Sequence, residues 1–170
     1  MAGGNTPKEF ERLPATAAER TVEGRPTREA VLSWWAERFG IDPGVFATHS
    51  FWERGAGKIW AMREDVALES PVAIEALGMH VLRARQEHWK PTLEAAQRFG
   101  HHATRNVIHL EADGARAFLA GEDREHDWDG DWGYLLVTHD VAGGPEPIGV
   151  GLYVHGELRS QVPKGRRREF

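Results

Sequence analysis

The chain has 170 residues, a net charge of −5 at neutral pH, seven tryptophans and no cysteine. The absence of cysteine excludes disulfide bonds, thiolate metal sites and cysteine nucleophiles, and it suits a reducing compartment, so we expect a cytoplasmic protein. No apolar run approaches the roughly 20 residues of a membrane-spanning helix, and the first residues lack the apolar core of a signal peptide.

The N-terminal half predicts an arm followed by a small α/β module over residues 25–104. Residues 1–24 contain many Gly, Pro, Thr and charged residues with weak periodicity, which is typical of a mobile arm. Thr27 is a candidate N-cap, and the apolar stripe that follows it indicates an amphipathic helix ending at Gly40.

Short strands and a second helix complete this module. Two aromatic segments, residues 51–54 and 58–62, flank Gly55-Ala56-Gly57, and this pattern favours a hairpin with a glycine-rich turn. Residues 81–85 predict another strand. Pro91 is expected at the first position of the second helix, because a helix leaves the N–H of that position unpaired and proline has none.

Residues 105–170 predict a small β-barrel with one short helix. We expect a strand at 106–110 and a helix at 113–119. The continuous apolar run at 134–139 predicts a strand in the centre of the sheet. A closing hairpin is expected over residues 147–162, where apolar side chains recur at every second position.

These segments resemble a PUA domain, the compact pseudo-barrel of RNA-modifying enzymes and ribosome-assembly factors. The resemblance rests on the strand at 106–110, on Ala117-Phe118-Leu119-Ala120-Gly121-Glu122 at the end of the helix, on the strand at 133–137, and on Pro147-Ile148-Gly149-Val150-Gly151-Leu152. It implies an α+β protein in which a small α/β module precedes a PUA-like β-barrel.

A wider part of the chain, residues 25–168, is similar to the C-terminal pre-PUA and PUA region of Nop/Sun-type RNA 5-methylcytosine methyltransferases. This similarity rests on Ala76-Leu77-Gly78, Lys90-Pro91-Thr92, Gln97-Arg98-Phe99-Gly100 and the basic segment 159–167. Related stand-alone archaeal proteins are associated with ribosome biogenesis. The resemblance therefore implies binding to rRNA or tRNA in ribosome biogenesis or RNA modification.

The sequence departs from these methyltransferases at the features that their chemistry requires. They use cysteines to attack the cytosine ring, and this chain has none. It also lacks a glycine-rich turn inside a βαβ unit, which an S-adenosylmethionine site would need. We expect an RNA-binding protein without enzymatic activity and without a cofactor. The alternative is a protein-interaction module that docks a separate RNA methyltransferase or assembly factor.

The densest positive charge in the chain lies at its C-terminal end. Because a guanidinium group offers phosphate a planar fork of donors, we expect these side chains to contact the RNA backbone, and basic residues elsewhere to extend the track. The alternative is a solvated, disordered terminus. The RNA-binding candidates are Lys58, Lys90, Arg98, Arg105, Arg159, Lys164, Arg166, Arg167 and Arg168.

Other conspicuous side chains have two interpretations each. Trp60 could stack on an RNA base beside Lys58, but packing in the first module is preferred. Trp89 precedes a predicted helix and is expected to be more exposed. A polar cluster at the domain boundary is either the floor of a ligand groove or a set of interdomain hydrogen bonds. This cluster consists of Arg98, His101, His102 and Arg105.

No metal site is expected. His101 and His102 lack further ligands at the spacing that zinc requires. The acidic segment 122–131 superficially resembles a calcium loop, but such a loop would need a glycine and a bidentate glutamate where the sequence has Trp132 and Thr138. A solvated acidic loop is therefore predicted, either as an adaptation to high salt or as a shield that keeps RNA off that face.

Overall fold

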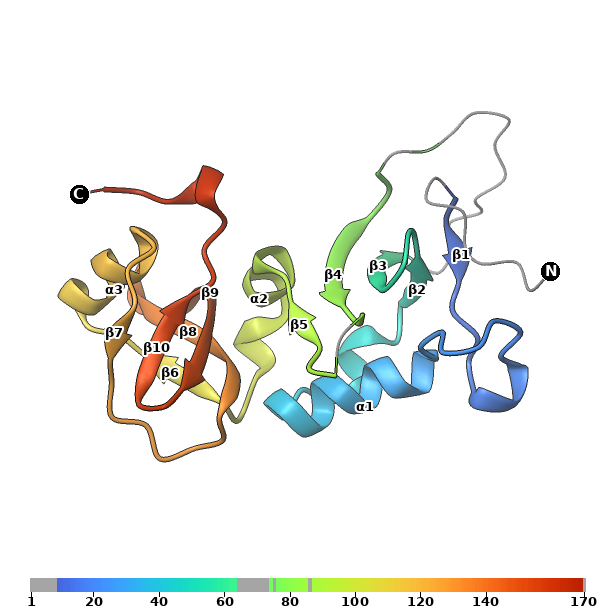
Figure 1. The fold of residues 1–170 in the computed structure, drawn as a ribbon, viewed down its shortest axis with the longest axis horizontal. Helices are drawn as coiled ribbons and strands as arrows, with labels where there is room; N and C mark the ends of the chain where they lie inside the picture. The colour runs from blue at the N-terminus through green and yellow to red at the C-terminus, as the bar shows by residue number, and fades with distance from the viewer. Residues whose placement is uncertain (1–8, 64–73, 75, 86, 170) are drawn as a thin grey trace. The chain divides into compact units, whose positions relative to one another are not determined.

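The computed structural model describes residues 9–63, 74, 76–85 and 87–169, and the chain divides into two compact units, Met1–Thr92 and Leu93–Phe170. Each unit combines a five-stranded sheet with helices (Figure 1), so the predicted α+β fold is confirmed. The division precedes the boundary expected between residues 104 and 105, because α2 (Leu93–Phe99) packs against β9 (Gly144–Val154). Among the described residues, no helix is long and apolar enough to cross a membrane.

The first unit is built on an antiparallel sheet whose strands neighbour one another in chain order. They are β1 (Glu11–Arg12), β2 (His49–Glu53), β3 (Lys58–Arg63), β4 (Met79–Arg83) and β5 (Lys90–Pro91). Helix α1 (Arg28–Phe39) and the 3-10 helices η1 (Ala17–Glu19) and η2 (Pro43–Phe46) complete the unit. The β2–β3 pair confirms the predicted hairpin, and both glycines of its turn, Gly55 and Gly57, have φ of 74°.

Helix α1 begins and ends where the sequence indicates. Thr27 Oγ1 accepts a hydrogen bond from the Ala30 N–H at 3.0 Å. Gly40 ends the helix in the left-handed conformation, with φ of 64°. The helix buries one apolar face as the core of the unit, formed by Val31, Trp35 and Phe39.

Part of the predicted mobile arm is an edge strand. β1 pairs with β2 and sets Arg12 opposite Trp52, and the next residue, Leu13, is buried. The expectation of mobility therefore does not hold for residues 11–13, because long-range pairing fixes them. Residues 1–8 of the predicted arm lie outside the described residues.

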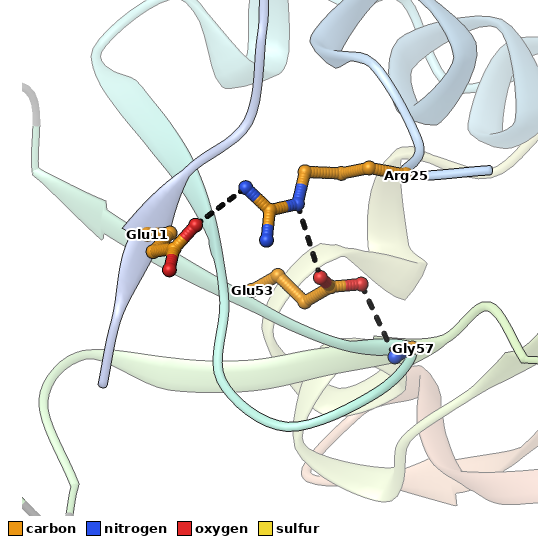
Figure 2. A network of polar contacts seen from close by, with 4 residues as sticks. All are labelled: Glu11, Arg25, Glu53 and Gly57. Atoms are coloured by element: carbon orange, nitrogen blue, oxygen red, sulfur yellow. Dashed lines mark hydrogen bonds and ion pairs between the residues drawn. The ribbon is translucent and has the colours of Figure 1, made fainter. Parts of the chain in front are cut away.

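A buried arginine connects this edge strand to the hairpin (Figure 2). Arg25 Nη1 donates to Glu11 Oε2 at 2.6 Å, and Arg25 Nε donates to Glu53 Oε1 at 3.2 Å. Glu53 Oε2 in turn accepts the Gly57 N–H at 3.1 Å. Only 6% of Arg25 and 7% of Glu53 is exposed. These contacts join β1, β2 and the β2–β3 turn through charge-assisted hydrogen bonds.

A β-bulge explains the imperfect alternation in β4. Ile59 pairs with Leu82 and Trp60 pairs with His80, so Val81 is an extra residue on its strand. A bulge of this kind interrupts the alternation of faces, and both Val81 and Leu82 are fully buried. The strand expected at 81–85 is thus present, although it begins and ends earlier in the chain.

The prediction for Pro91 is wrong. Lys90 and Pro91 form β5, which pairs with Arg83 and Leu82, and α2 begins only at Leu93. β5 is the edge strand of its sheet. A proline is tolerated at an edge because the N–H that it lacks is not needed for a second partner strand.

The second unit contains a sheet of order β6-β8-β9-β10-β7, in which β6 is parallel to β8 and the other neighbours are antiparallel. Its remaining strands are β6 (Val107–His109), β7 (Arg124–Glu125), β8 (Gly133–Val141) and β10 (Glu157–Ser160). Helix α3 (Ala112–Leu119) and the 3-10 helices η3 (Gly100–His102) and η4 (Lys164–Arg166) accompany it. β8 lies inside the sheet, as its continuous apolar run predicts.

Strand β9 turns its glycines, not its branched residues, toward the core of this unit. Gly149 and Gly151 are buried, whereas Leu152 is half-buried. A Cβ atom at Gly149 would lie 2.9 Å from Phe118 Cε1, and one at Gly151 would lie 2.5 Å from Leu158 Cδ1. Glycine is therefore required where α3 and β10 approach the strand most closely. The core consists of Ile108, Leu110, Ala115, Phe118, Leu135, Val137, Tyr153, Leu158 and Val162.

Candidate nucleic-acid interface

The basic C-terminal segment, residues 163–169, is anchored to the second unit. The Arg168 N–H donates to the Leu119 carbonyl oxygen at 2.9 Å, and Arg167 Nε donates to the Val162 carbonyl oxygen at 3.2 Å. These bonds hold the segment against the end of α3. Its basic side chains are exposed, namely those of Lys164, Arg166, Arg167 and Arg168. The segment is therefore an ordered basic surface, in contrast to the alternative of a disordered terminus.

Three of the candidate arginines form ion pairs with acids of the same unit. The shortest pair joins Arg166 Nη2 to Glu94 Oε1 at 2.7 Å, with 54% of the arginine side chain exposed. The other two pairs join Arg159 Nε to Glu157 Oε1 at 2.8 Å and Arg105 Nη2 to Asp131 Oδ2 at 3.7 Å. These carboxylates reduce the positive charge that the segment presents to a polyanion.

Such exposed pairs are weak enough to exchange their partners. A solvent-exposed ion pair stabilises a folded protein by about 0–1 kcal/mol, because water screens the charges and both side chains lose rotamer freedom. A phosphate oxygen can replace a carboxylate oxygen at a guanidinium group with the same geometry. The observed pairs therefore attenuate phosphate binding by the arginines without preventing it.

Two further arginines, which the sequence reasoning missed, lie at a groove of about 590 Å³ along α3. Arg116 pairs with Asp113 at 3.2 Å, and Arg124 pairs with Glu122 at 3.4 Å. The groove is lined by Asp113, Arg116, Ala117, Ala120, Glu122, Arg124 and Glu169. The signal that could have identified Arg116 is the helical spacing of the first four of these residues, which places them on one face of α3. Arg124 was hidden by its acidic neighbours in the sequence.

The remaining candidates are placed as follows. Lys58 is exposed at the start of β3, opposite Arg83 on β4. Arg98 is exposed in the last turn of α2. Lys90 is half-buried in β5. Lys58 and Lys90 thus belong to the first unit, and the candidates that the structure brings together are those of the C-terminal segment.

The environment of Lys90 disfavours its charge. Burial of the ammonium group, followed by repulsion from the Arg83 guanidinium, lowers the pKa of Lys90 below its usual value of 10.5. Because the folded-state pKa is below the unfolded value, the protonated lysine destabilises the fold. The free energy of unfolding should therefore rise as the pH increases from the folded-state pKa of Lys90 to 10.5.

The Arg83→Gln variant should raise the pKa of Lys90 only part of the way back to its usual value. The substitution removes the repulsion, but the larger cause, burial, remains. The measurement is an NMR titration of the Lys90 side chain, with Arg85→Gln as a control that should leave the pKa unchanged. An unchanged pKa in Arg83→Gln would contradict this attribution.

The rings around Trp60 favour its packing interpretation. The Phe10 ring meets Trp60 edge-on at 5.3 Å between centroids, and His80 stacks on it at 5.3 Å. These neighbours occupy the surface that a base would need. Trp89 is half-buried and lies 6.3 Å from Trp34, so it also packs within the first unit.

The polar cluster expected at the domain boundary is divided in the structure. The rings of His101 and His102 contact each other, with centroids 4.0 Å apart, whereas Arg105 pairs with Asp131. His101 lines a groove of about 430 Å³ in the second unit, together with Gly100, Ala103, Val107, His109, Thr138, Asp140, Pro145 and Pro147. In the part of the chain that the structure describes, no group of three or more His, Asp or Glu side chains is arranged to hold a metal ion.

Comparisons with known families support the two-unit division and identify one unit. Residues 105–168 match the methyltransferase RsmF PUA domain, and residues 2–78 match a family of unknown function (DUF7122). No curated protein matches the chain. The C-terminal region is therefore a PUA domain similar to those of Sun/Nop-type methyltransferases, which confirms the resemblance inferred from the sequence. PUA domains bind RNA, and this makes RNA the supported partner.

Proposed function

We propose that this protein is a non-catalytic RNA-binding protein that acts on rRNA or tRNA in ribosome biogenesis or RNA modification. The observation that supports it best is the PUA domain at residues 105–168, with its ordered basic segment on the surface. The lack of cysteine in the sequence supports the non-catalytic part of the proposal, since the related methyltransferases attack cytosine with cysteine.

Binding would be electrostatic in its first term. The segment supplies Lys164 and three consecutive arginines, and η4 holds the first of these arginines at the surface. Each phosphate that such a side chain neutralises releases counterions, so affinity should fall as salt increases. The neighbouring carboxylates, Glu94 above all, would compete with phosphate for the guanidinium groups.

Replacing Arg166, Arg167 and Arg168 by alanine should weaken RNA binding and flatten its salt dependence. If each arginine contacts one phosphate, the slope of log K against log salt should decrease by about 0.7–0.9 per lost contact. The measurement is filter binding of the full chain to unfractionated tRNA and to an rRNA fragment at several salt concentrations. The anchoring N–H of Arg168 is retained in the variant, so the segment should stay in place.

Two variants serve as controls for this experiment. Alanine at the exposed residues Arg12, Arg20 and Arg85 removes the same formal charge from the first unit and should reduce the slope less. Glu94→Gln removes the carboxylate that competes for Arg166 and should increase affinity. An unchanged affinity and salt slope in the triple-arginine variant would remove the C-terminal segment from the interface.

A further inference from the structure

Trp132 presents the most exposed large apolar side chain in the described part of the chain, with 58% of its surface accessible. It precedes β8, and one side of its ring meets the exposed His155 edge-on, with centroids 4.9 Å apart. Half-buried Leu152 and Val154 lie on one face of β9 and lead to His155. A single exposed apolar residue is ordinary on a protein surface, so its surroundings decide whether this one has a role.

The loop before Trp132 is held in one conformation by its own contacts. Trp128 Nε1 donates to the Asp131 carbonyl oxygen at 3.0 Å, and Asn106 Nδ2 donates to Asp131 Oδ2 at 3.2 Å. Gly130 is required between them, because a Cβ atom there would lie 2.5 Å from the Trp128 ring. Trp128 itself packs against the core of the unit. The indole of Trp132 is thus presented on an ordered support, which lowers the entropy cost of binding.

The surface around this indole is acidic. Residues 122–131 contain six carboxylates and one arginine, and Asp127, Asp129 and Asp131 are all exposed. This charge repels the phosphates of RNA and attracts cations. An exposed indole face is also a favourable contact for a guanidinium or ammonium group. Both properties select a positively charged partner.

We propose that Trp132 and the flanking carboxylates of Asp127 and Asp129 bind a cationic segment of a partner protein, with an arginine or lysine side chain over the free face of the indole. The half-buried apolar residues of β9 would contact aliphatic parts of the same segment, which a small free cation could not provide. The protein then has two separate surfaces, a basic one for RNA and an acidic aromatic one for protein. This proposal does not depend on RNA binding.

The test is a titration of the ¹⁵N-labelled full chain with a tetra-arginine peptide amide. The seven tryptophans give seven indole N–H signals, and Trp132→Phe assigns the relevant one. We expect the Trp132 signal to shift most, and Trp132→Ala to weaken peptide binding by about two- to fivefold, as expected for an exposed cation–π contact. A tetra-glutamine peptide should leave the signal unchanged.

Matched charge variants separate a local site from general attraction to an acidic protein. Asp127→Asn with Asp129→Asn should weaken binding more than Asp113→Asn with Asp140→Asn, which removes two equally exposed charges from the same unit. Equal weakening by both pairs, or full affinity in Trp132→Ala, would overturn the proposal. So would a single-stranded RNA hexamer that shifts the Trp132 signal more than the peptide does. RNA affinity should be unchanged in Trp132→Ala, so failure here is distinguishable from failure of the RNA-binding function.

Discussion

The Arg25→Ala variant should lose about 3–5 kcal/mol of the free energy of unfolding of the first unit. Arg25 is buried and donates to two carboxylates, at 2.6 Å to Glu11 and at 3.2 Å to Glu53 (Figure 2). Without the guanidinium, the buried Glu53 retains the Gly57 N–H but loses its counter-charge. A stranded buried charge costs far more than the net gain that an intact ion pair provides.

Hydrogen exchange or the NMR signal of Trp35, which is fully buried in this unit, would report the unfolding locally. The exposed Arg20 is the matched control, and Arg20→Ala should change the free energy of unfolding by about 0.5 kcal/mol or less. Adding Glu53→Gln to Arg25→Ala should recover part of the loss, because it neutralises the stranded carboxylate. A loss of less than about 1 kcal/mol in Arg25→Ala would show that the network is not a stabilising clamp.

The Phe118→Ala variant should lose about 3–5 kcal/mol in the PUA domain. Phe118 is 2% exposed, and its ring fills the space that Gly149 leaves open on β9. Its carbonyl oxygen also accepts a hydrogen bond from Ser160 Oγ at 2.7 Å, which joins α3 to β10. Removal of the ring leaves a cavity between helix and sheet that the backbone cannot close without breaking this bond.

Urea unfolding followed at the Trp128 indole N–H would measure this loss within the PUA domain. Phe118→Leu retains much of the buried volume and should lose less, whereas alanine at the exposed Val141 should be nearly neutral. RNA affinity should fall in parallel with stability in Phe118→Ala, because the adjacent Leu119 carbonyl anchors the basic segment. An unfolding midpoint equal to that of the unaltered chain would contradict this account of the core.

The candidate interface could be predicted only in part. The positive charge near the C-terminus is evident from the sequence, because consecutive arginines are counted directly. The acids that pair with them are not, since Glu94 and Arg166 are distant in the chain and meet only in the folded unit. Arg116 was overlooked for the related reason that one arginine in a helix has no distinctive pattern until the neighbouring surface is known.

The sequence by itself determined those elements whose signals are local. Thr27 and Gly40 set the ends of α1 through the hydrogen bonds and the backbone conformation of single residues, and the glycines at 55 and 57 set a turn. Only the tertiary structure decided that residues 11–13 belong to a sheet and that Pro91 belongs to a strand. The same holds for β9, whose glycines face the core. In each of these cases the deciding free energy comes from residues far away in the chain, from pairing with another strand or from close packing against α3, and no local pattern contains it.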